Sequence, residues 1–204
     1  MPRPKDPAVR AMLLERAATM LRARDPITLR SLVDGTGVST MAVYTHFGGM
    51  EQLWQWLRQE GFTLLAARLA AITPPRDPVE HLATLAVAYL QHALDHPDLY
   101  RVMFDTTVDL PDPQAADDTL DFLVEAAARA VTAGRFADRE PAHVLATRTW
   151  VVGHGLASLV ATGPLPDDTL GLAPGLLESV FVGFGDDPRR CRTSIRRAWR
   201  TPPA

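Results

Sequence analysis

The stretch from Thr28 to Phe47, TLRSLVDGTGVSTMAVYTHF, constrains the fold more than any other part of the chain. It predicts a short amphipathic helix, a tight turn that contains glycine, and a second short helix rich in small and hydroxyl residues. A helix-turn-helix has this form when its second helix enters the major groove of DNA. The stretch therefore indicates a DNA-binding protein, and the rest of the chain should explain what controls it.

Caps, turn and core of this motif can be assigned from residue type. Thr28 is expected to cap the first helix and Ser39 the second, since short hydroxyl side chains accept a hydrogen bond from the first helical turn. Gly37 suits the left-handed backbone that such a turn requires. The apolar residues predicted to face inward are Leu29, Leu32, Val33, Val38, Val43 and Phe47.

The other face of the motif carries side chains suited to DNA. Hydroxyl groups can bond base edges or phosphates, and small apolar groups can contact the thymine methyl. Arg30 is the one nearby residue able to make a bidentate contact with guanine or a firm phosphate contact. The predicted DNA-contacting residues are Thr28, Arg30, Ser39, Thr40, Met41, Ala42, Tyr44, Thr45 and His46.

The remaining sequence reads as helical throughout. Acidic residues followed by proline, at Asp6, Asp77, Glu140 and Asp187, are typical helix starts, and apolar residues recur between them at helical spacing. Alternating runs typical of strands are absent. We predict an all-α fold, with a three-helix DNA-binding domain over residues 1–48. A long fourth helix then leads directly into a helical effector-binding and dimerisation domain over residues 49–204.

Charge is unevenly distributed along the chain, whose net charge is −3. Residues 1–50 carry 7 Lys and Arg against 4 Asp and Glu, and residues 51–185 carry 8 against 18. A basic N-terminal module on an acidic body suggests that nucleic acid binds at one end only. The Arg-rich segment 186–204 is expected to be a solvated helix or to form salt bridges with the acidic body, rather than to bind DNA.

Several classes of function find no support in the sequence. The single cysteine, Cys191, excludes an internal disulfide and a cysteine-built zinc site, and no cofactor or metal is expected. No glycine-rich phosphate loop, HExxH pair or nucleophile elbow is present, so an enzyme is not expected. No secretion signal and no apolar run of about 20 residues occurs. These features predict a soluble cytoplasmic protein without a membrane partner.

The motif resembles the DNA-binding domain of TetR-family repressors. The resemblance is carried by Thr28-Leu29-Arg30, Leu32-Val33, Gly37-Val38-Ser39, Val43-Tyr44-Thr45-His46-Phe47 and Glu51-Gln52-Leu53. Residues 148–163, with Trp150, His154 and Gly155, resemble the Trp-x-x-x-His-Gly helix of a TetR-family C-terminal domain, and residues 78–104 match the same group loosely. The resemblance implies an all-helical homodimer with a ligand pocket in its C-terminal domain, acting as a repressor.

One position departs from the family pattern. The family usually has a lysine at the start of the fourth helix, where this chain has Met50. A charged phosphate anchor is therefore missing, although backbone N–H groups at a helix start can also hold a phosphate. We expect a shallower dependence of DNA affinity on salt than in relatives with the lysine.

Small residues predict the dimer interface. Gly153, Gly155, Ala157 and Ser158 make their helix slim, which permits close approach of another helix. With the apolar helix at 174–184, the helix at 142–162 would supply half of a four-helix interface in a homodimer. The alternative is ordinary core packing within one chain. Two-fold symmetry favours the dimer, because it suits a palindromic operator on double-stranded DNA.

An effector pocket is expected between the fourth and the eighth predicted helices, in the C-terminal domain. Apolar lining with a few polar anchors is typical of ligand pockets, so an unknown small apolar or aromatic effector is expected. Each aromatic residue alone is more often part of a core. The alternative functions are a helical interaction module or an enzyme, in either case without a DNA function. The candidate pocket residues are Trp54, Leu57, Phe62, Tyr89, His92, Met103, Phe104, Phe122, Trp150 and His154.

Overall fold

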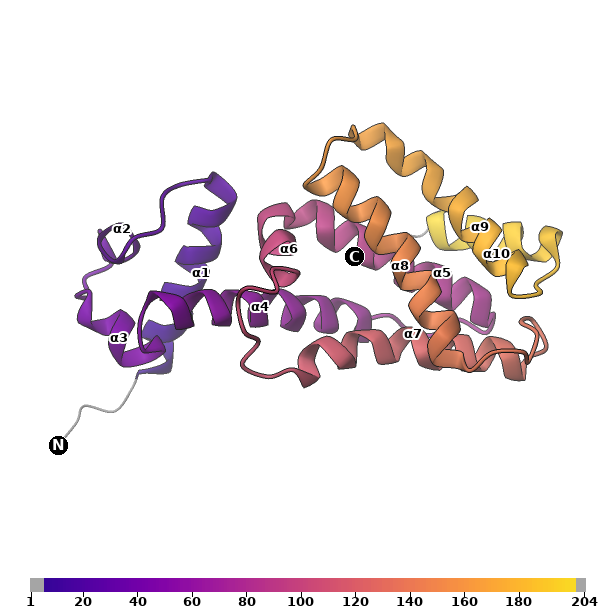
Figure 1. Cartoon of the computed structure of the whole chain (residues 1–204), viewed down its shortest axis with the longest axis horizontal. Coiled ribbons are helices and arrows are strands. Elements are labelled where there is room, and N and C mark those ends of the chain that lie inside the picture. Colours follow the sequence, from indigo (N-terminus) through magenta and orange to yellow (C-terminus); the bar gives the residue numbers. More distant parts are fainter. Residues whose placement is uncertain (1–5, 201–204) are drawn as a thin grey trace. The chain divides into compact units, whose positions relative to one another are not determined.

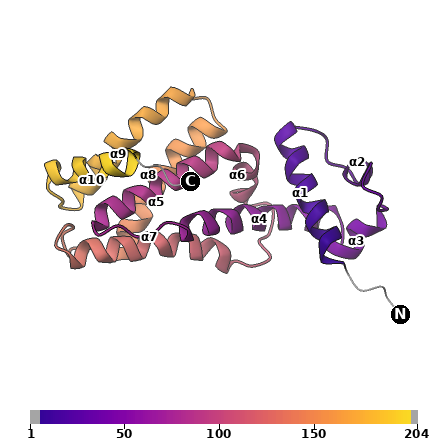
Figure 2. The ribbon, with the colours of Figure 1, turned by 180° about the vertical axis from the view of Figure 1, so that it is seen from behind.

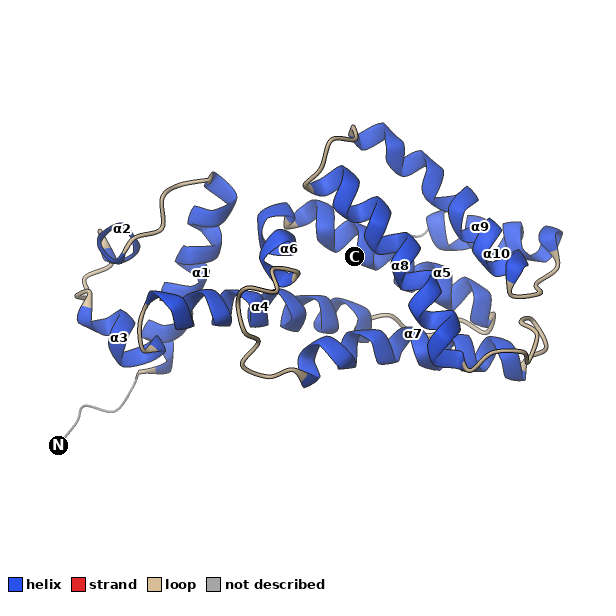
Figure 3. Cartoon of the chain, viewed as in Figure 1, coloured by secondary structure: helices blue, strands red, loops and turns tan. Residues whose placement is uncertain are grey.

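Within residues 6–200, which the computed structural model describes, every regular element is a helix (Figure 3). The predicted all-α fold is confirmed. The elements, in chain order, are α1 (Pro7–Ala23), α2 (Leu29–Val33), α3 (Met41–Phe47), α4 (Met50–Ala70), α5 (Pro78–Asp95), α6 (Pro97–Met103), α7 (Gln114–Thr132), α8 (Ala142–Ala161), the 3-10 helix η1 (Asp167–Leu172), α9 (Ala173–Gly183) and α10 (Pro188–Arg200).

Three of the four acidic-proline pairs start helices as predicted. The carboxylates of Asp6, Asp77 and Asp187 each accept backbone N–H groups of the first turn, with shortest distances of 2.9 to 3.0 Å. At the fourth pair the helix begins one residue later, at Ala142, and Pro141 is the N-cap. Proline in the first turn removes no hydrogen bond, because the first N–H groups of a helix lack a partner within it.

The chain divides into two compact units. One contains residues up to 63 together with 96–113, and the other contains 64–95 together with the chain from 114 onward. The first unit thus holds the predicted helix-turn-helix, and the second holds α5 and α7 to α10. The domain boundary between residues 48 and 49 stays a prediction.

The N-terminal unit is built around α1, which packs against α2, α3 and α6. Its core combines leucines of α1 with apolar residues of the helix-turn-helix and the first turns of α4. Gly61 of α4 lets α6 approach closely, since a Cβ there would lie 2.3 Å from the Cγ of Met103. The buried members of this core are Leu13, Leu14, Ala17, Leu32, Val43, Phe47, Leu53, Leu57 and Val102.

In the C-terminal unit, α5, α7 and α8 pack against one another side by side (Figure 1, Figure 2). α9 lies against α8, and α10 packs against both α5 and α9. α5 is the central helix, with most of its residues buried. α10 buries Cys191, Ser194, Ile195 and Ala198 on one face and exposes its six arginines on the other.

The Arg-rich segment is a helix with salt bridges to the acidic body, as predicted. Arg192 pairs with Glu178 of α9 at 2.8 Å, and Arg197 pairs with Glu80 of α5 at 3.6 Å. These pairs are largely exposed, so each contributes little to stability.

A buried ion network joins four segments of the C-terminal unit. The guanidinium of Arg135 donates to both oxygens of Asp186 at 2.7 Å and to Asp77 at 2.6 Å. Ser194 of α10 donates to the other oxygen of Asp77 at 2.6 Å. Burial favours the neutral carboxyl of Asp77, but the Ser194 hydrogen bond and the Arg135 charge outweigh it and lower the pKa of Asp77. This network ties the start of α5 to α10 and to the two loops after α7 and α9.

By length and composition alone, α8 is the one helix among the described residues that could cross a membrane. This differs from the expectation that no run of the chain approaches that composition. About 33% of its most apolar window is buried, and α8 packs against α5, α7 and α9. A core helix of a globular protein passes the same test, so this is weak evidence for a membrane span.

Candidate nucleic-acid interface and effector site

The first helix of the motif is held by a reciprocal cap. The Thr28 hydroxyl accepts from the backbone N–H of Ser31 at 3.1 Å, and the Ser31 hydroxyl accepts from the N–H of Thr28 at 2.9 Å. Thr28 is therefore the N-cap of α2, as predicted. Such a capping box satisfies two N–H groups that the helix itself leaves without partners. The second member of this box, Ser31, was not predicted from the sequence.

The turn and the second helix differ in one respect from the prediction. Gly37 has φ 76°, so its predicted left-handed backbone is confirmed. The predicted Ser39 cap is wrong, because Thr40 is the N-cap of α3 and makes no side-chain capping bond. The Ser39 carbonyl instead accepts from Ala42 N–H at 2.9 Å, within a tight first turn. The Ser39 side chain is exposed and is therefore not used by the helix it precedes.

The inward face of the motif is as predicted. Leu32, Val43 and Phe47 are buried in the core of the N-terminal unit, and Leu29, Val33 and Val38 pack against that core. Because Val43 and Phe47 of α3 are both buried in this core, the rotation of α3 about its own axis is fixed. That rotation decides which side chains α3 presents to solvent.

The outward face of α3 carries large side chains that are exposed to solvent and do not pack in the core. Met41 is 65% exposed and Tyr44 is 50% exposed, and Thr45 is also exposed. The Thr45 hydroxyl donates to the Met41 carbonyl at 2.9 Å, and it keeps its acceptor capacity outward. Arg30, on α2, is exposed as well. The exposed side chains of the two helices thus offer apolar, hydroxyl and guanidinium groups to a ligand.

Three other predicted DNA contacts lie less openly. Thr40 and His46 are half-buried, and Ala42 is half-buried with its side chain against the hydrophobic core. A side chain that packs inward has little reach toward a base edge. Contact of Ala42 with DNA stays a prediction that its position does not favour.

The start of α4 has the backbone of an anion site but no basic side chain. Gly48 and Gly49 have φ 95° and 147°, which few other residues adopt, and they aim the chain into the helix. Met50 is half-buried against the core of the N-terminal unit. Glu51 is exposed in the first turn and would repel a phosphate. In the absence of a basic side chain, the backbone N–H groups of this helix start are the candidates to hold a phosphate.

The candidate pocket residues divide between the two units. The N-terminal unit contains Trp54, Leu57, Phe62, Met103 and Phe104. Leu57 is fully buried in the core beside α1, and Trp54 packs against that core. The rings of Phe62 and Phe104 meet edge to face, with centroids 5.8 Å apart. Leu57 and Trp54 thus serve the packing of the helix-turn-helix unit.

In the C-terminal unit, three candidates form one cluster, which we call the Tyr-His-Trp cluster: Tyr89, His154 and Trp150. The Tyr89 hydroxyl lies 2.9 Å from Nδ1 of His154, and the Trp150 indole N–H donates to the same hydroxyl at 3.3 Å. The Trp150 and His154 rings lie against each other, with centroids 5.4 Å apart. Burial lowers the pKa of His154, which favours the neutral ring at physiological pH. The cluster combines aromatic surface with hydrogen-bonding groups.

The two other candidates, His92 and Phe122, lie in the same unit. His92 is buried on α5, one turn after Tyr89. Phe122 lines an open hollow of about 460 Å³ between α4 and α7, with Ala66, Ala67, Ala70, Asp118 and Asp121. The structure thus places Phe122 in a surface hollow of its own.

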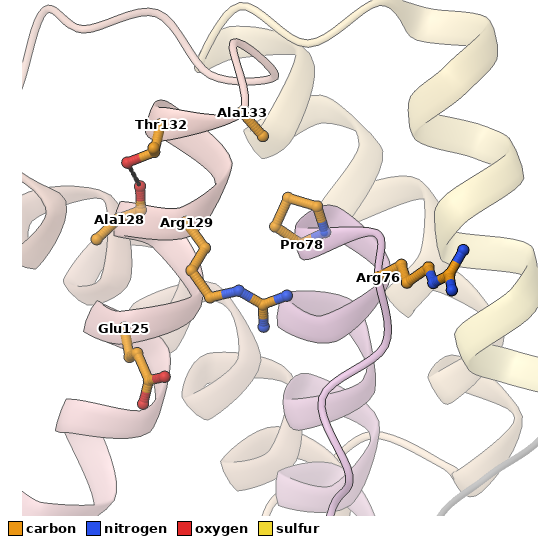
Figure 4. Close-up of a pocket in the computed structure, with 7 residues that line it drawn as sticks. All are labelled: Arg76, Pro78, Glu125, Ala128, Arg129, Thr132 and Ala133. Atoms are coloured by element: carbon orange, nitrogen blue, oxygen red, sulfur yellow. Dashed lines mark hydrogen bonds between the residues drawn. The ribbon is translucent and has the colours of Figure 1, made fainter.

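A second hollow, of about 410 Å³, lies between the start of α5 and the last turns of α7 (Figure 4). Its lining residues are Arg76, Pro78, Glu125, Ala128, Arg129, Thr132 and Ala133. None of them was among the predicted site residues. Arg129 follows Glu125 by four residues, a spacing that usually indicates an exposed ion pair, so no sequence pattern distinguishes it as a site residue.

Apolar side chains are exposed on α8 and around α9. Val151 and Leu159 of α8 are 57% and 46% exposed, and Leu172 and Leu176 are also exposed. An added Cβ at Gly155 or Gly175 would meet no atom within 4 Å. This surface is apolar and uncrowded within one chain.

Comparison with known proteins identifies the fold. Residues 82–180 match the family described as tetracyclin repressor-like, C-terminal domain. A protein of unknown function from Rhodococcus sp. RHA1 has 25% identity and a TM-score of 0.71, over 86% of this chain and 95% of that one. A tetR-family regulatory protein from Rhodococcus RHA1 has 21% identity and a TM-score of 0.68, over 88% and 98%. RolR, solved with resorcinol, has 19% identity and a TM-score of 0.65, over 97% and 96%. No curated protein matches the sequence.

Proposed function

The chain belongs to the TetR family of transcriptional regulators, which are not enzymes, and we propose that it is a cytoplasmic repressor. In this proposal a homodimer binds a palindromic operator, and a small apolar or aromatic effector releases it. Proteins of this family bind DNA and small molecules and act as dimers. Repression follows when the bound dimer blocks access to a promoter.

The observation that carries the DNA-binding role is the division of α3 into two faces. Val43 and Phe47 are held in the core, while Met41, Tyr44 and Thr45 are exposed. The exposed side chains stand on a seven-residue helix whose other face is anchored in the core, so α3 presents them in a defined orientation. Tyr44 would donate to a phosphate and Met41 would contact thymine methyl groups.

The exposed apolar surface of α8 and α9 supports the homodimer. Val151, Leu159 and Leu176 are 57%, 46% and 39% exposed in the single chain, and a second chain packed on α8 and α9 would bury them. The glycines beside them leave room for a second helix pair to approach. Pairing of two chains through this surface would also give the two-fold symmetry of a palindromic operator.

The Tyr-His-Trp cluster supports an aromatic effector. Ring surfaces of Trp150 and Tyr89 can pack against an aromatic ring, and the polar atoms of Tyr89 and His154 can orient it. RolR, which has the same fold, was solved with resorcinol, a small phenol. A small neutral phenol is thus the class of effector that we propose first.

An electrophoretic mobility shift assay with DNA from upstream of the protein's own gene tests the DNA-binding role. We expect Tyr44→Ala and Arg30→Ala to weaken binding at least about tenfold, which corresponds to roughly 1.4 kcal/mol. Arg22→Ala is the control, since Arg22 is exposed on α1 outside the motif. Unchanged affinity in both motif variants, with unchanged melting temperature, would refute the proposed docking surface.

Titration of resorcinol and other neutral phenols into the protein–DNA complex tests the effector. Release by phenols that is lost in Tyr89→Phe would support the cluster as the effector site. Release only by highly charged metabolites would contradict it. A folded dimer that binds no DNA would instead favour the alternative, a helical interaction module.

A further inference from the structure

The hollow beside Arg129 has the properties of a second ligand site, separate from the Tyr-His-Trp cluster. We propose that it binds a small apolar organic acid, with the carboxylate of the acid on the guanidinium of Arg129. This goes beyond the proposed repressor function and does not depend on it.

Arg129 is held in place by two fixed acceptors. One terminal nitrogen donates to Nδ1 of His81 at 3.1 Å, and the other donates to the carbonyl of Pro75 at 3.0 Å. Because a guanidinium can only donate, Nδ1 of His81 carries no proton. Burial, together with the charge of Arg129, lowers the pKa of His81 and keeps its ring neutral. The guanidinium is therefore oriented before any ligand arrives.

The remaining donors of Arg129 are available to a ligand. A guanidinium has five N–H groups, and within the described residues Arg129 uses two of them. Glu125 lies one turn before Arg129 on α7. It takes part in none of the ion pairs within residues 6–200, so it does not pair with Arg129. Pre-oriented donors lose little entropy on binding, and a charged donor forms the stronger class of hydrogen bond.

The side chains that line the hollow indicate the chemistry of the ligand beyond its carboxylate. Pro78, Ala128 and Ala133 are apolar and small, and Thr132 directs its hydroxyl to the Ala128 carbonyl at 3.0 Å (Figure 4). The side chain of Arg76 extends away from Arg129 on the other side of Pro78 in the same view. The lining also holds the carboxylate of Glu125 and a second cation, Arg76. A ligand with one carboxylate, placed on Arg129, on an apolar body suits this mixture better than a polyphosphate, which Glu125 would repel more strongly. The volume of about 410 Å³ is large enough for a small molecule.

The test measures binding of 4-fluorobenzoate to the full chain by fluorine NMR, with the neutral 4-fluorobenzamide as the matched ligand. We expect the wild type to bind the acid at least about tenfold more tightly than the amide, since only the acid pairs with Arg129. Arg129→Gln should remove that preference. Ala128→Phe should fill the hollow and weaken binding of both ligands at least about tenfold.

Two controls keep the result interpretable. Ala128→Phe retains Arg129 and both of its acceptors, so an unchanged melting temperature shows that lost binding does not come from unfolding. Tyr89→Phe alters the proposed effector site and should leave binding of 4-fluorobenzoate unchanged. Equal affinity for acid and amide in the wild type would overturn the proposal. So would binding that survives Ala128→Phe, or binding that disappears in Tyr89→Phe. None of these measurements uses DNA, so their failure would leave the repressor function untouched.

Discussion

Removing Arg135 should destabilise the protein more than removing any exposed arginine. Arg135 is 5% exposed and makes a two-pronged contact with Asp186, which is 4% exposed, besides its contact with Asp77. Arg135→Met keeps the apolar stem but leaves the Asp186 carboxylate buried without its counter-charge. Breaking one side of a buried pair costs about 3–5 kcal/mol. A chain of this size loses roughly 2–4 °C of melting temperature per kcal/mol, so a decrease of roughly 6–20 °C is expected.

Urea denaturation followed by circular dichroism, at one fixed protein concentration, measures this loss. Arg192→Met is the matched control, because Arg192 forms its ion pair with Glu178 at the surface. That control should cost less than about 1 kcal/mol. Adding Asp186→Leu to Arg135→Met should recover a large part of the loss, because the more deeply buried of the two uncompensated carboxylates is then gone and only the partly exposed Asp77 remains. A cost below about 1 kcal/mol for Arg135→Met, or no recovery in the double variant, would refute the assignment of the loss to a buried charge.

Three further predictions concern the interface, the packing and the pH dependence. Met50→Lys should strengthen operator binding, because it adds one phosphate contact. The slope of the logarithm of the binding constant against the logarithm of the salt concentration, measured by fluorescence anisotropy, should become steeper by about 0.9. An unchanged slope would contradict this. Gly61→Ala should cost about 1–3 kcal/mol in urea denaturation, because the new Cβ would lie 2.3 Å from Cγ of Met103; an unchanged midpoint would contradict this close contact. The pKa of Asp77 is lower in the folded chain than its usual 3.8, so the stability that its charge supplies is complete above that value and is lost as the pH falls below it. Asp77→Asn should therefore make the melting temperature fall less steeply as the pH is lowered. An unchanged fall would contradict this role of Asp77.

Local patterns predicted the helices well, because the signals that start them are local. The caps at Asp6, Asp77 and Asp187 depend on residues two or three positions away, and periodicity identifies the buried faces of α2 and α3. The Ser39 cap failed because a tight first turn of α3 satisfies the same backbone groups without a side chain. That choice depends on how α3 packs, which its own sequence does not specify.

The candidate sites were less predictable, because they join residues far apart in the chain. The sequence named ten candidate pocket residues, and the structure packs two of them, Leu57 in the core beside α1 and Trp54 against it; the pocket itself stays a prediction. Tyr89, Trp150 and His154 were each named, although their mutual hydrogen bonds depend on how α5 packs against α8. Arg135 and Arg129 were not singled out at all. A buried arginine and an exposed one look alike in a sequence until the fold supplies their partners.

The glycines on the exposed surface of α8 and α9 have a consequence for gene duplication. At Gly155, Gly175 and Gly183 an added Cβ meets no atom of the described chain within 4 Å, and replacing a helical glycine by alanine favours the helix by roughly 0.5–1 kcal/mol. Substitutions there change which surfaces fit together while leaving each chain able to fold. In the proposed homodimer, two copies could therefore diverge at these positions after duplication and stop forming mixed pairs, each remaining a separate regulator in the same cell.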